Sequence, residues 1–483
     1  MNATTIDATA TAAVTARNRL VINLLLVSSF VVILNETIMS VAIPPLMASL
    51  GVTAGAAQWV TTAFLLTMAV VIPMTGFLLQ RLHTRTIFVL AMSLFSLGTL
   101  AAAVAPGLEL LVAARVVQAS GTAIMMPLLM TTVMTLVPPE ARGKKMGDIM
   151  MVISVAPALG PVLSGLILNY LHWRWLFVLV LPIALFSLWL GWRRIENVTT
   201  PRKAPLDLAS VVISILAFGG SVYGVSLLGR APVPGQPPAW AALVVGGIAM
   251  IVFVWRQINL QRTDSALLDL RVFASRDFRV CLLMMLILML TLFGTIILLP
   301  IYLQNVLGIR PLLTGLLLCP GALLMGRLGQ RVGGWYDRIG PTKLVVPGVV
   351  IVTIILWAMT LLGTQTRWEY ILAGHLVMCV GFALLFTPLF TASLSSVPPQ
   401  LYSHGSAVLA SLQQVAGATG VAMFIAIMTA QQVKLAASGA VPVEALAGGI
   451  RSAFFAGAVG GIFAVACAFF VRKPASAAAH AGH

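Results

Sequence analysis

Residues 21–43 read VINLLLVSSFVVILNETIMSVAI, an almost unbroken apolar run that contains one acidic residue, Glu36. A helix needs about 20 apolar residues to cross the hydrocarbon core of a membrane, which is about 30 Å thick. This run is long enough to cross, and it is too long for the apolar segment of a cleaved signal peptide. It therefore predicts a membrane-spanning helix near the N-terminus, with an ionisable group inside the membrane.

The composition of the whole chain is also that of a membrane protein. Of its 483 residues, 60% are apolar and 9% are charged, and the mean hydropathy is +1.02. Soluble domains carry about 25% charged residues, so lipid must surround much of this chain. The cysteines lie inside apolar runs without paired spacing, so we expect neither a disulfide nor a metal site. They are Cys281, Cys319, Cys379 and Cys467.

Apolar runs of similar length recur along the chain. We count about fourteen of them, and none has the short alternating pattern of a transmembrane barrel. Their approximate ranges are 21–43, 57–79, 86–105, 108–137, 146–171, 175–192, 206–228, 239–255, 278–303, 312–332, 344–362, 370–397, 405–430 and 449–471. The sequence therefore predicts an all-α membrane protein, because helices satisfy their own backbone hydrogen bonds in lipid.

The lysines and arginines are distributed unequally between the two sides of the membrane. A net charge of +16 could suggest a nucleic-acid partner, but with a cytoplasmic N-terminus most lysines and arginines fall in cytoplasmic connections, as the positive-inside rule requires. Those on the other side are Arg174, Arg230, Arg310, Arg367, Lys434 and Arg451. We therefore expect a multi-pass protein of the cell membrane with both termini cytoplasmic and no nucleic-acid partner. A basic face for anionic lipid is compatible with the same pattern.

The chain divides at its longest polar connections, residues 193–205 and 256–279. Similar turns follow the second and tenth runs, GFLLQR at 76–81 and GGWYDRIG at 333–340. Repeated halves around a central site are the usual plan of secondary transporters. We predict a cytoplasmic tail over 1–19, a six-helix bundle over 20–194, two inserted helices over 206–256, a second six-helix bundle over 277–472 and a cytoplasmic tail over 473–483.

Ionisable residues inside a membrane are costly and usually functional. Glu36 is the acidic residue deep in a predicted span and Arg115 the basic one, each roughly 10 Å from the outer end of its run at 1.5 Å per residue. We predict that they couple protons, because burial favours a neutral carboxyl while the arginine favours a carboxylate. A purely structural ion pair is the alternative.

Polar and methionine side chains near this pair could bind a ligand, or could bridge helices and fill the core. The predicted substrate cavity is lined by Asn35, Gln118, Met125, Gln413 and Gln414.

Residues 156–165 read APALGPVLSG. Prolines and glycines bend a helix and give it a smooth face for close packing, and ordinary packing is the alternative to a functional motif. The residues that we single out are Pro157, Gly160, Pro161 and Gly165.

The turns that end the second and tenth runs predict a cytoplasmic gate. Asp337 can bond a helix N-terminus or a basic partner, and we expect Asp148 to pair with Arg81. The turn lacks the Gly-Lys-Ser/Thr ending of a phosphate-binding loop. The predicted gate residues are Gly76, Arg81, Asp148, Gly333, Asp337, Arg338 and Gly340.

Together these features resemble the major facilitator superfamily. The turn over 333–343 is similar to its loop signature, residues 115–121 to its helix-4 motif and residues 157–165 to its antiporter motif. The chain further resembles the fourteen-helix drug:proton antiporter branch, nearest the lincomycin-resistance subgroup, in NETIMSVAIP at 35–44, WRW at 173–175, LDL at 268–270 and LPIYLQ at 299–304. Gln80, where the family usually has aspartate, and Ser164, in place of a glycine, depart from the pattern.

The resemblance implies two six-helix bundles around a central cavity, with two extra helices packed outside. It implies export of small lipophilic drug-like compounds, cationic ones included, in exchange for protons by alternating access. The proton gradient would supply the energy without a cofactor, and we expect a monomer. An uptake symporter or an exporter of an endogenous metabolite or lipid would share the fold. A membrane enzyme would need paired carboxylates or a serine dyad in its spans, which we do not see.

Single cysteines test the predicted sidedness. In a variant without native cysteines, Ser476→Cys should be labelled from the cytoplasm and Ser438→Cys from outside by a membrane-impermeant thiol reagent. An even number of spans returns the chain to the cytoplasm at Ser476, and the last span separates Ser438 from it. Labelling of both positions from the same side would contradict the predicted topology.

Overall fold

The computed structural model describes residues 3–197, 201, 207–228 and 238–472. In this part of the chain the regular elements are helices, and no strand is present. Thirteen of the helices are long and apolar enough to cross a membrane. The prediction of an all-α membrane protein is therefore confirmed. The predicted tail over 473–483 lies outside the described residues, whereas most of the predicted tail over 1–19 belongs to the first helix.

The first bundle is built from the N-terminal helices. They are α1 (Ala3–Leu50), α2 (Ala54–Arg81), α3 (Thr84–Ala103), α4 (Leu108–Leu136), the short η1 (Pro139–Ala141), α5 (Arg142–Tyr170), α6 (Trp175–Val178) and α7 (Val180–Arg194). Helix α4 packs against α1, α2 and α3, and α1 packs against α5. The last two helices together form one span.

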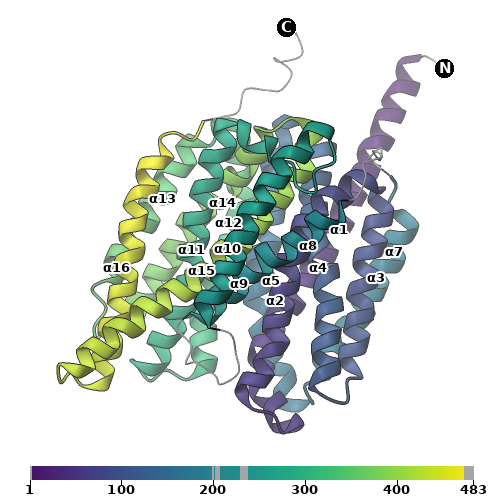
Figure 1. Cartoon of the computed structure of the whole chain (residues 1–483). Coiled ribbons are helices and arrows are strands. Elements are labelled where there is room, and N and C mark those ends of the chain that lie inside the picture. The colour runs from purple at the N-terminus through teal and green to yellow at the C-terminus, as the bar shows by residue number, and fades with distance from the viewer. Residues whose placement is uncertain (1–2, 198–200, 202–206, 229–237, 473–483) are drawn as a thin grey trace.

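The second bundle follows the same plan. Its helices are η4 (Leu270–Ala274), α11 (Arg276–Asn305), α12 (Pro311–Ile339), α13 (Thr342–Met359), α14 (Trp368–Ser395), η5 (Pro399–Leu401), α15 (Tyr402–Ala437) and α16 (Pro442–Ala468). Helix α12 is as long as its neighbours and lies within the bundle (Figure 1), but it is not among the thirteen apolar spans.

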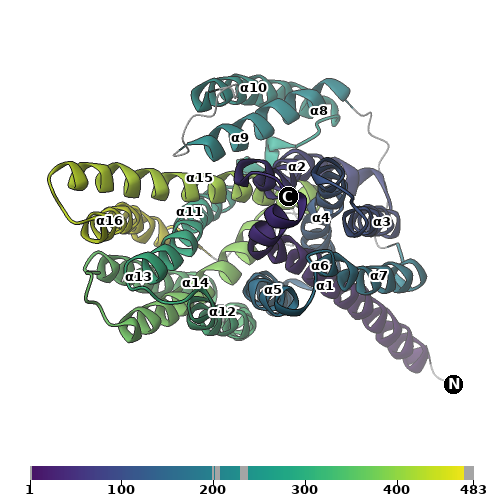
Figure 2. The ribbon, with the colours of Figure 1, turned by 90° about the horizontal axis from the view of Figure 1, so that it is seen from below.

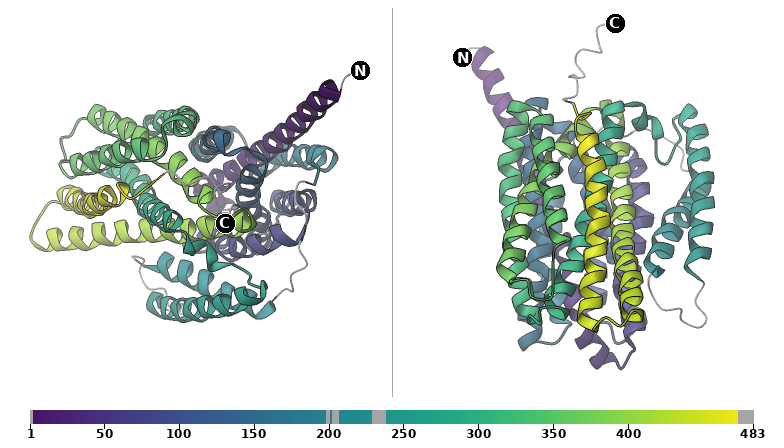
Figure 3. Two further views of the ribbon diagram at one scale, coloured as in Figure 1. Left: turned by 90° about the horizontal axis from the view of Figure 1, so that it is seen from above. Right: turned by 90° about the vertical axis from the view of Figure 1, so that its left-hand side faces the viewer.

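Two inserted spans lie beside the bundles. They are formed by α8 (Leu208–Ser214), the π-helical η2 (Ile215–Gly219), α9 (Gly220–Leu227), α10 (Ala239–Leu260) and η3 (Gln261–Thr263). Figures 2 and 3 show them at the side where α2 and α15 meet, and they contact both of these helices. Asp207 caps α8 and accepts two hydrogen bonds from Arg256, at 2.7 and 2.8 Å. These bonds hold the pKa of Asp207 well below its usual range.

Some of the helices begin at a side chain that accepts from their free backbone N–H groups. Thr53 caps α2 by accepting from the backbone of Ala56, and Ser275 caps α11 by accepting from Phe278. Gly340 ends α12 at a φ of +78°, a conformation that favours glycine. Within each bundle the turns between spans are short, so consecutive helices run in opposite directions across the membrane.

The two bundles touch along two seams, α5 with α12 and α2 with α15. In the first seam, glycines bring the backbones together: a Cβ on Gly333 would lie 2.1 Å from the carbonyl oxygen of Gly143, and one on Gly147 would lie 2.6 Å from that of Gly329. Glycines four apart on each helix permit such close contact in a membrane. Both ends of the described chain lie at this end of the bundles (Figure 1), which is the predicted cytoplasmic side.

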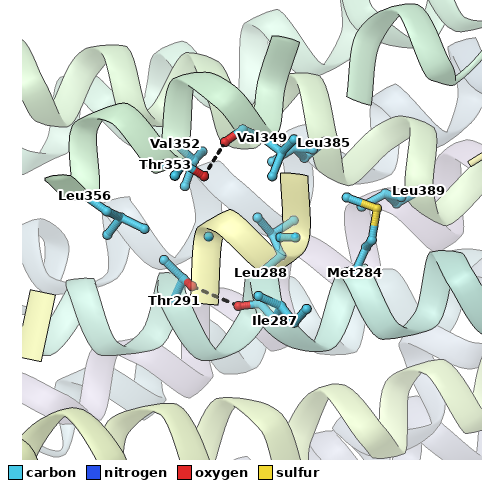
Figure 4. A pocket seen from close by; sticks show the side chains of 12 residues that line it. Met284, Ile287, Leu288, Thr291, Val349, Val352, Thr353, Leu356, Leu385 and Leu389 are labelled. Atoms are coloured by element: carbon cyan, nitrogen blue, oxygen red, sulfur yellow. Dashed lines mark hydrogen bonds between the residues drawn. The ribbon is translucent and has the colours of Figure 1, made fainter. Parts of the chain in front are cut away.

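A small apolar cavity lies inside the second bundle (Figure 4). It is lined mainly by leucine and valine side chains of α11, α13 and α14. The hydroxyls of Thr291 and Thr353, which also line it, donate to carbonyl oxygens of their own helices. Its polar groups are therefore satisfied, and it is a packing defect rather than a site for a polar ligand.

Two adjacent glycines test the seam. Gly333→Ala should destabilise the protein by about 1–3 kcal/mol, because the added methyl group has no space. Gly334→Ala is the matched control, since nothing lies within 4 Å of a Cβ there. Thermal unfolding in detergent should show a lower Tm for the first variant and an unchanged or higher Tm for the second. Equal changes in both would mean that the close contact of α5 with α12 does not contribute to stability.

Candidate functional site

Arg115 lies in the middle of the first bundle and is fully buried. Its Nη1 donates to Oδ1 of Asn35 on α1, at 3.1 Å, and to Oε1 of Gln118 on its own helix. Its Nε lies 3.5 Å from the carbonyl oxygen of Val60 on α2. Phe64, also on α2, places its ring 3.9 Å from the guanidinium carbon. The charge is thus held by neutral groups from three helices, and the aromatic face adds a cation–π attraction.

A further hydrogen-bond chain fixes Gln118. Its Nε2 donates to the hydroxyl of Thr99 on α3 at 2.7 Å, and that hydroxyl donates to the carbonyl oxygen of Phe95 at 2.6 Å. All these side chains are buried. The orientation of the Gln118 amide follows from this chain, because its nitrogen must donate to Thr99 and its oxygen is left for the arginine.

Glu36 lies next to Asn35 on α1, and its side chain is partly exposed. Arg115 is the charged group that acts on it electrostatically. Within the described chain, however, the Glu36 carboxyl has no hydrogen-bond partner and no basic nitrogen within 4 Å, and Nη2 of Arg115 is buried without a partner. The structure therefore brings the two predicted residues to the same level but does not join them in an ion pair.

The glycines of α5 differ in their surroundings: one lies against α1 and another has open space beside it. A Cβ on Gly160 would lie 2.2 Å from the hydroxyl of Thr37, so α1 and α5 touch one residue beyond Glu36. Pro157 and Pro161 are accommodated within the helix. Gly165, nearer the outer end, has nothing within 4 Å of a Cβ position. This segment therefore fixes α1 beside the candidate proton site and leaves space beyond it.

The predicted cavity residues separate into two groups. Asn35, Gln118 and Met125 are buried, and the two amides are occupied by Arg115. Gln413 and Gln414 on α15 are partly exposed, and Nε2 of Gln413 is buried without a partner. An amide with an unused donor is suited to a ligand, whereas the buried amides serve the arginine.

Asp337 joins the bundles at the predicted cytoplasmic end. Its two carboxylate oxygens accept from the backbone N–H groups of Gly143 and Lys144, at 2.8 and 3.0 Å. These groups belong to the first turn of α5, where free N–H groups and the helix dipole favour a negative charge. Arg338, the next residue, is exposed. The predicted gate carboxylate therefore caps a helix of the opposite bundle.

The second seam has an amide at the matching place. Gln80, at the end of α2, donates to the carbonyl oxygen of Gln400 at 3.1 Å, just before α15 begins. A Cβ on Gly76 would lie 2.9 Å from Nδ1 of His404 on α15. This seam lacks a carboxylate at Gln80, and we infer that it is held less strongly than the other.

The expectation that Asp148 pairs with Arg81 was wrong. Asp148 accepts from Lys145 at 3.0 Å and from Gln330 of α12 at 3.1 Å, so it strengthens the seam between α5 and α12 instead. Arg81 lies over the ring of Phe77 on its own helix. The reason is position, since Asp148 projects from α5 toward α12 and not toward α2.

In the described chain, the polar contacts between the bundles lie toward one end of the molecule. Besides those already described, the hydroxyls of Thr131 on α4 and Ser406 on α15 lie 2.8 Å apart. Among the described residues, these polar contacts therefore join the bundles at the predicted cytoplasmic end.

The buried His404 and the partly buried His375 were missed because only Asp, Glu, Lys and Arg were considered as ionisable residues in the spans. Nδ1 of His404 accepts from the backbone N–H of Asp269 at 3.2 Å, which places the connection after α10 against the α2–α15 seam. Nε2 of His375 on α14 lies 3.3 Å from the carbonyl oxygen of Leu318. Their position inside apolar runs was the available signal. No cluster of three or more potential metal ligands occurs in the described part of the chain.

Comparison with known proteins places these features in a family. Residues 25–421 match the family described as Major Facilitator Superfamily. The chain is 36% identical to the lincomycin resistance protein LmrB of Listeria monocytogenes over 453 residues, which cover 93% of this chain and 95% of the relative. It is 30% identical to the multidrug resistance protein B homolog of Mycobacterium tuberculosis over 410 residues, which cover 82% of this chain and 73% of the relative.

Solved structures share the fold. The human organic anion transporter MFSD10 superposes with a TM-score of 0.66 at 14% sequence identity, over 93% of this chain and 99% of that one. The proton:xylose symporter XylE superposes with a TM-score of 0.64 at 14% identity, over 95% of this chain and 97% of that one. The arrangement of helices around the site is thus common to proteins of very different sequence.

The Asp337 cap can be tested with a reporter at Thr131, where α4 meets α15 between the two bundles. In a variant without native cysteines, Thr131→Cys should react slowly with a thiol reagent applied from the cytoplasmic side. Adding Asp337→Asn should speed that reaction about tenfold, because a charge-assisted hydrogen bond contributes about 1.5–3 kcal/mol. Asp264→Asn, on an exposed carboxylate of the α10–α11 connection, should leave the rate unchanged. Equal rates in all three proteins would mean that Asp337 does not hold the seam closed.

Proposed function

Because the chain belongs to the major facilitator superfamily of membrane transporters, we propose that it exports drug-like compounds in exchange for protons. Relatives that match nearly its whole length are named for resistance to lincomycin or to several drugs. Resistance by a membrane transporter is explained most simply by removal of the compound from the cell. The exported class would be small lipophilic molecules, cationic ones included.

The observation that carries the proton-coupling part is the pair of unused groups at the centre of the first bundle. Glu36 has an unpaired carboxyl, and Arg115 has a buried nitrogen without a partner. An acid deep in a membrane span is a functional candidate by default. Since the Glu36 side chain is partly exposed, a proton can reach it. Until that proton binds, the positive charge of Arg115 favours the carboxylate form of Glu36.

Closure at the cytoplasmic end supports alternating access. The contacts of Asp337, Asp148 and Gln80 join the bundles there. Closure at this end is what an outward-facing state requires, in which a drug leaves and a proton binds. The return requires these contacts to separate and the outer halves to meet, as expected for rocking bundles.

The cavity side chains support a broad substrate range. Gln413 offers an unused amide donor. With one acid and few directional polar groups, such a site would select substrates by size, lipophilicity and charge. A cationic substrate could compete with the proton for Glu36 directly, whereas a neutral one would compete through the conformational equilibrium.

Transport in proteoliposomes tests the proposal. Lincomycin and a panel of lipophilic cations should accumulate against their gradients when a pH gradient is imposed, and the direction of movement should correspond to export. Glu36→Gln keeps the shape and removes the titrating group, so it should reduce proton-driven accumulation at least tenfold. Binding and downhill exchange should persist.

Glu109→Gln is the control, since Glu109 is an exposed acid in the first turn of α4. It should transport as the wild type does. Accumulation in the uptake direction would favour the symporter alternative. Full proton-driven accumulation by the Glu36→Gln protein would remove Glu36 from the mechanism.

A further inference from the structure

Asn35 and Glu36 are neighbours on α1, and successive side chains on a helix point about 100° apart. They cannot both face Arg115. In this structure the amide faces it, with its Oδ1 3.1 Å from Nη1. Glu36 faces a partly exposed region instead. A neutral acceptor therefore occupies the place next to the guanidinium that the acid would otherwise take.

The remaining contacts hold the guanidinium toward Asn35. Gln118 is anchored through Thr99 and accepts from the same Nη1. The ring of Phe64 lies against the guanidinium, 3.9 Å from Cζ. Nη2 remains without a partner although it is buried. Keeping an arginine and an acid apart inside a membrane costs free energy. These neighbours must therefore hold Arg115 in place for it to stay separate from Glu36.

We propose that Asn35 is a positioning residue that keeps Arg115 apart from Glu36 in the outward-facing state and so sets the pH at which Glu36 binds its proton. This inference rests on the proposed function, in which Glu36 carries the proton. While the amide binds Nη1, the acid is free to be protonated from outside. When α1 turns or shifts in the other state, the acid can replace the amide and give up its proton as it pairs with the arginine.

No other charged group competes for this role in the described helices. Those packed on α1, namely α2, α5, α6 and α7, carry their charged residues at or near their ends, and the other charged residue of α4, Glu109, lies exposed in its first turn. Arg115 is the charged group that acts on Glu36. The position of this one arginine therefore controls the acid.

Two substitutions at Asn35 should move the titration in opposite directions. Asn35→Leu removes the acceptor, so Arg115 can turn to Glu36 and favour its carboxylate, and protonation should then require a lower pH. Asn35→Asp places a carboxylate against the guanidinium and cancels its field, so Glu36 should protonate at a higher pH. Each shift should be about one pH unit, a tenfold change in proton affinity. Phe64→Leu, which loosens the arginine without removing an acceptor, should give a smaller shift in the direction of Asn35→Leu.

Infrared titration of the carboxyl band in purified, lipid-reconstituted protein measures this without a drug. The Glu36 band is isolated by subtracting the spectrum of the same protein carrying Glu36→Gln. A merely structural role of Asn35 would lower the Tm of both variants without shifting the midpoints in opposite directions.

The outcomes separate the two proposals. Shifts of opposite sign support the positioning role. Unchanged midpoints, or shifts of the same sign, overturn it, even if Glu36→Gln abolishes proton-driven transport. If Asn35→Leu does not fold, Phe64→Leu takes its place, and its titration midpoint should shift in the direction opposite to that of Asn35→Asp. If Glu36→Gln transports normally, the proposed function fails and the positioning role fails with it.

Discussion

A positive charge inside a membrane needs acceptors around it, and four helices of the first bundle meet that need at Arg115. The arginine belongs to α4, one acceptor to α1, another to α2, and the amide of Gln118 is anchored on α3. Lipid supplies no replacement for any of these groups. Displacing one helix would leave a buried donor unsatisfied, which costs more than a typical hydrogen bond contributes. This constraint favours movement of α2, α3 and α4 as a unit, whereas α1 can turn without leaving the donor unsatisfied if Glu36 replaces Asn35 as the acceptor.

The contacts between bundles are of a different kind. Glycine backbones lie against each other, and Asp337 caps the first turn of α5 from the opposite bundle. Such contacts need no burial of charge in hydrocarbon, and water can replace them when the seam opens. The two seams also differ, because a carboxylate closes one and Gln80 the other. Firm bundles with a separable inner seam are the mechanical requirement for alternating access.

The inserted spans are connected to the same inner seam. Gln257 of α10 donates to Ser210 of α8 and accepts from the backbone of Leu268. The next residue, Asp269, donates its N–H to His404 beside Gly76 of the first bundle. The LDL segment that the sequence singled out is thus the point where the insert meets both bundles. Its position couples the insert to the cytoplasmic ends of α2 and α15.

The sequence by itself determined the spans and the two ionisable residues inside them, because lipid penalises polar groups wherever they occur in the fold. It could not determine the partners of those residues. Whether Asn35 or Glu36 faces Arg115 depends on the rotation of α1 about its axis, and whether Asp148 meets Arg81 or Gln330 depends on which helices the bundles bring together. His375 and His404 were overlooked for a related reason, since an imidazole in an apolar run has a role only when its neighbours are known. These choices belong to the tertiary structure, because a hydrogen bond forms only at about 3 Å and in the right direction, and only packed helices fix both.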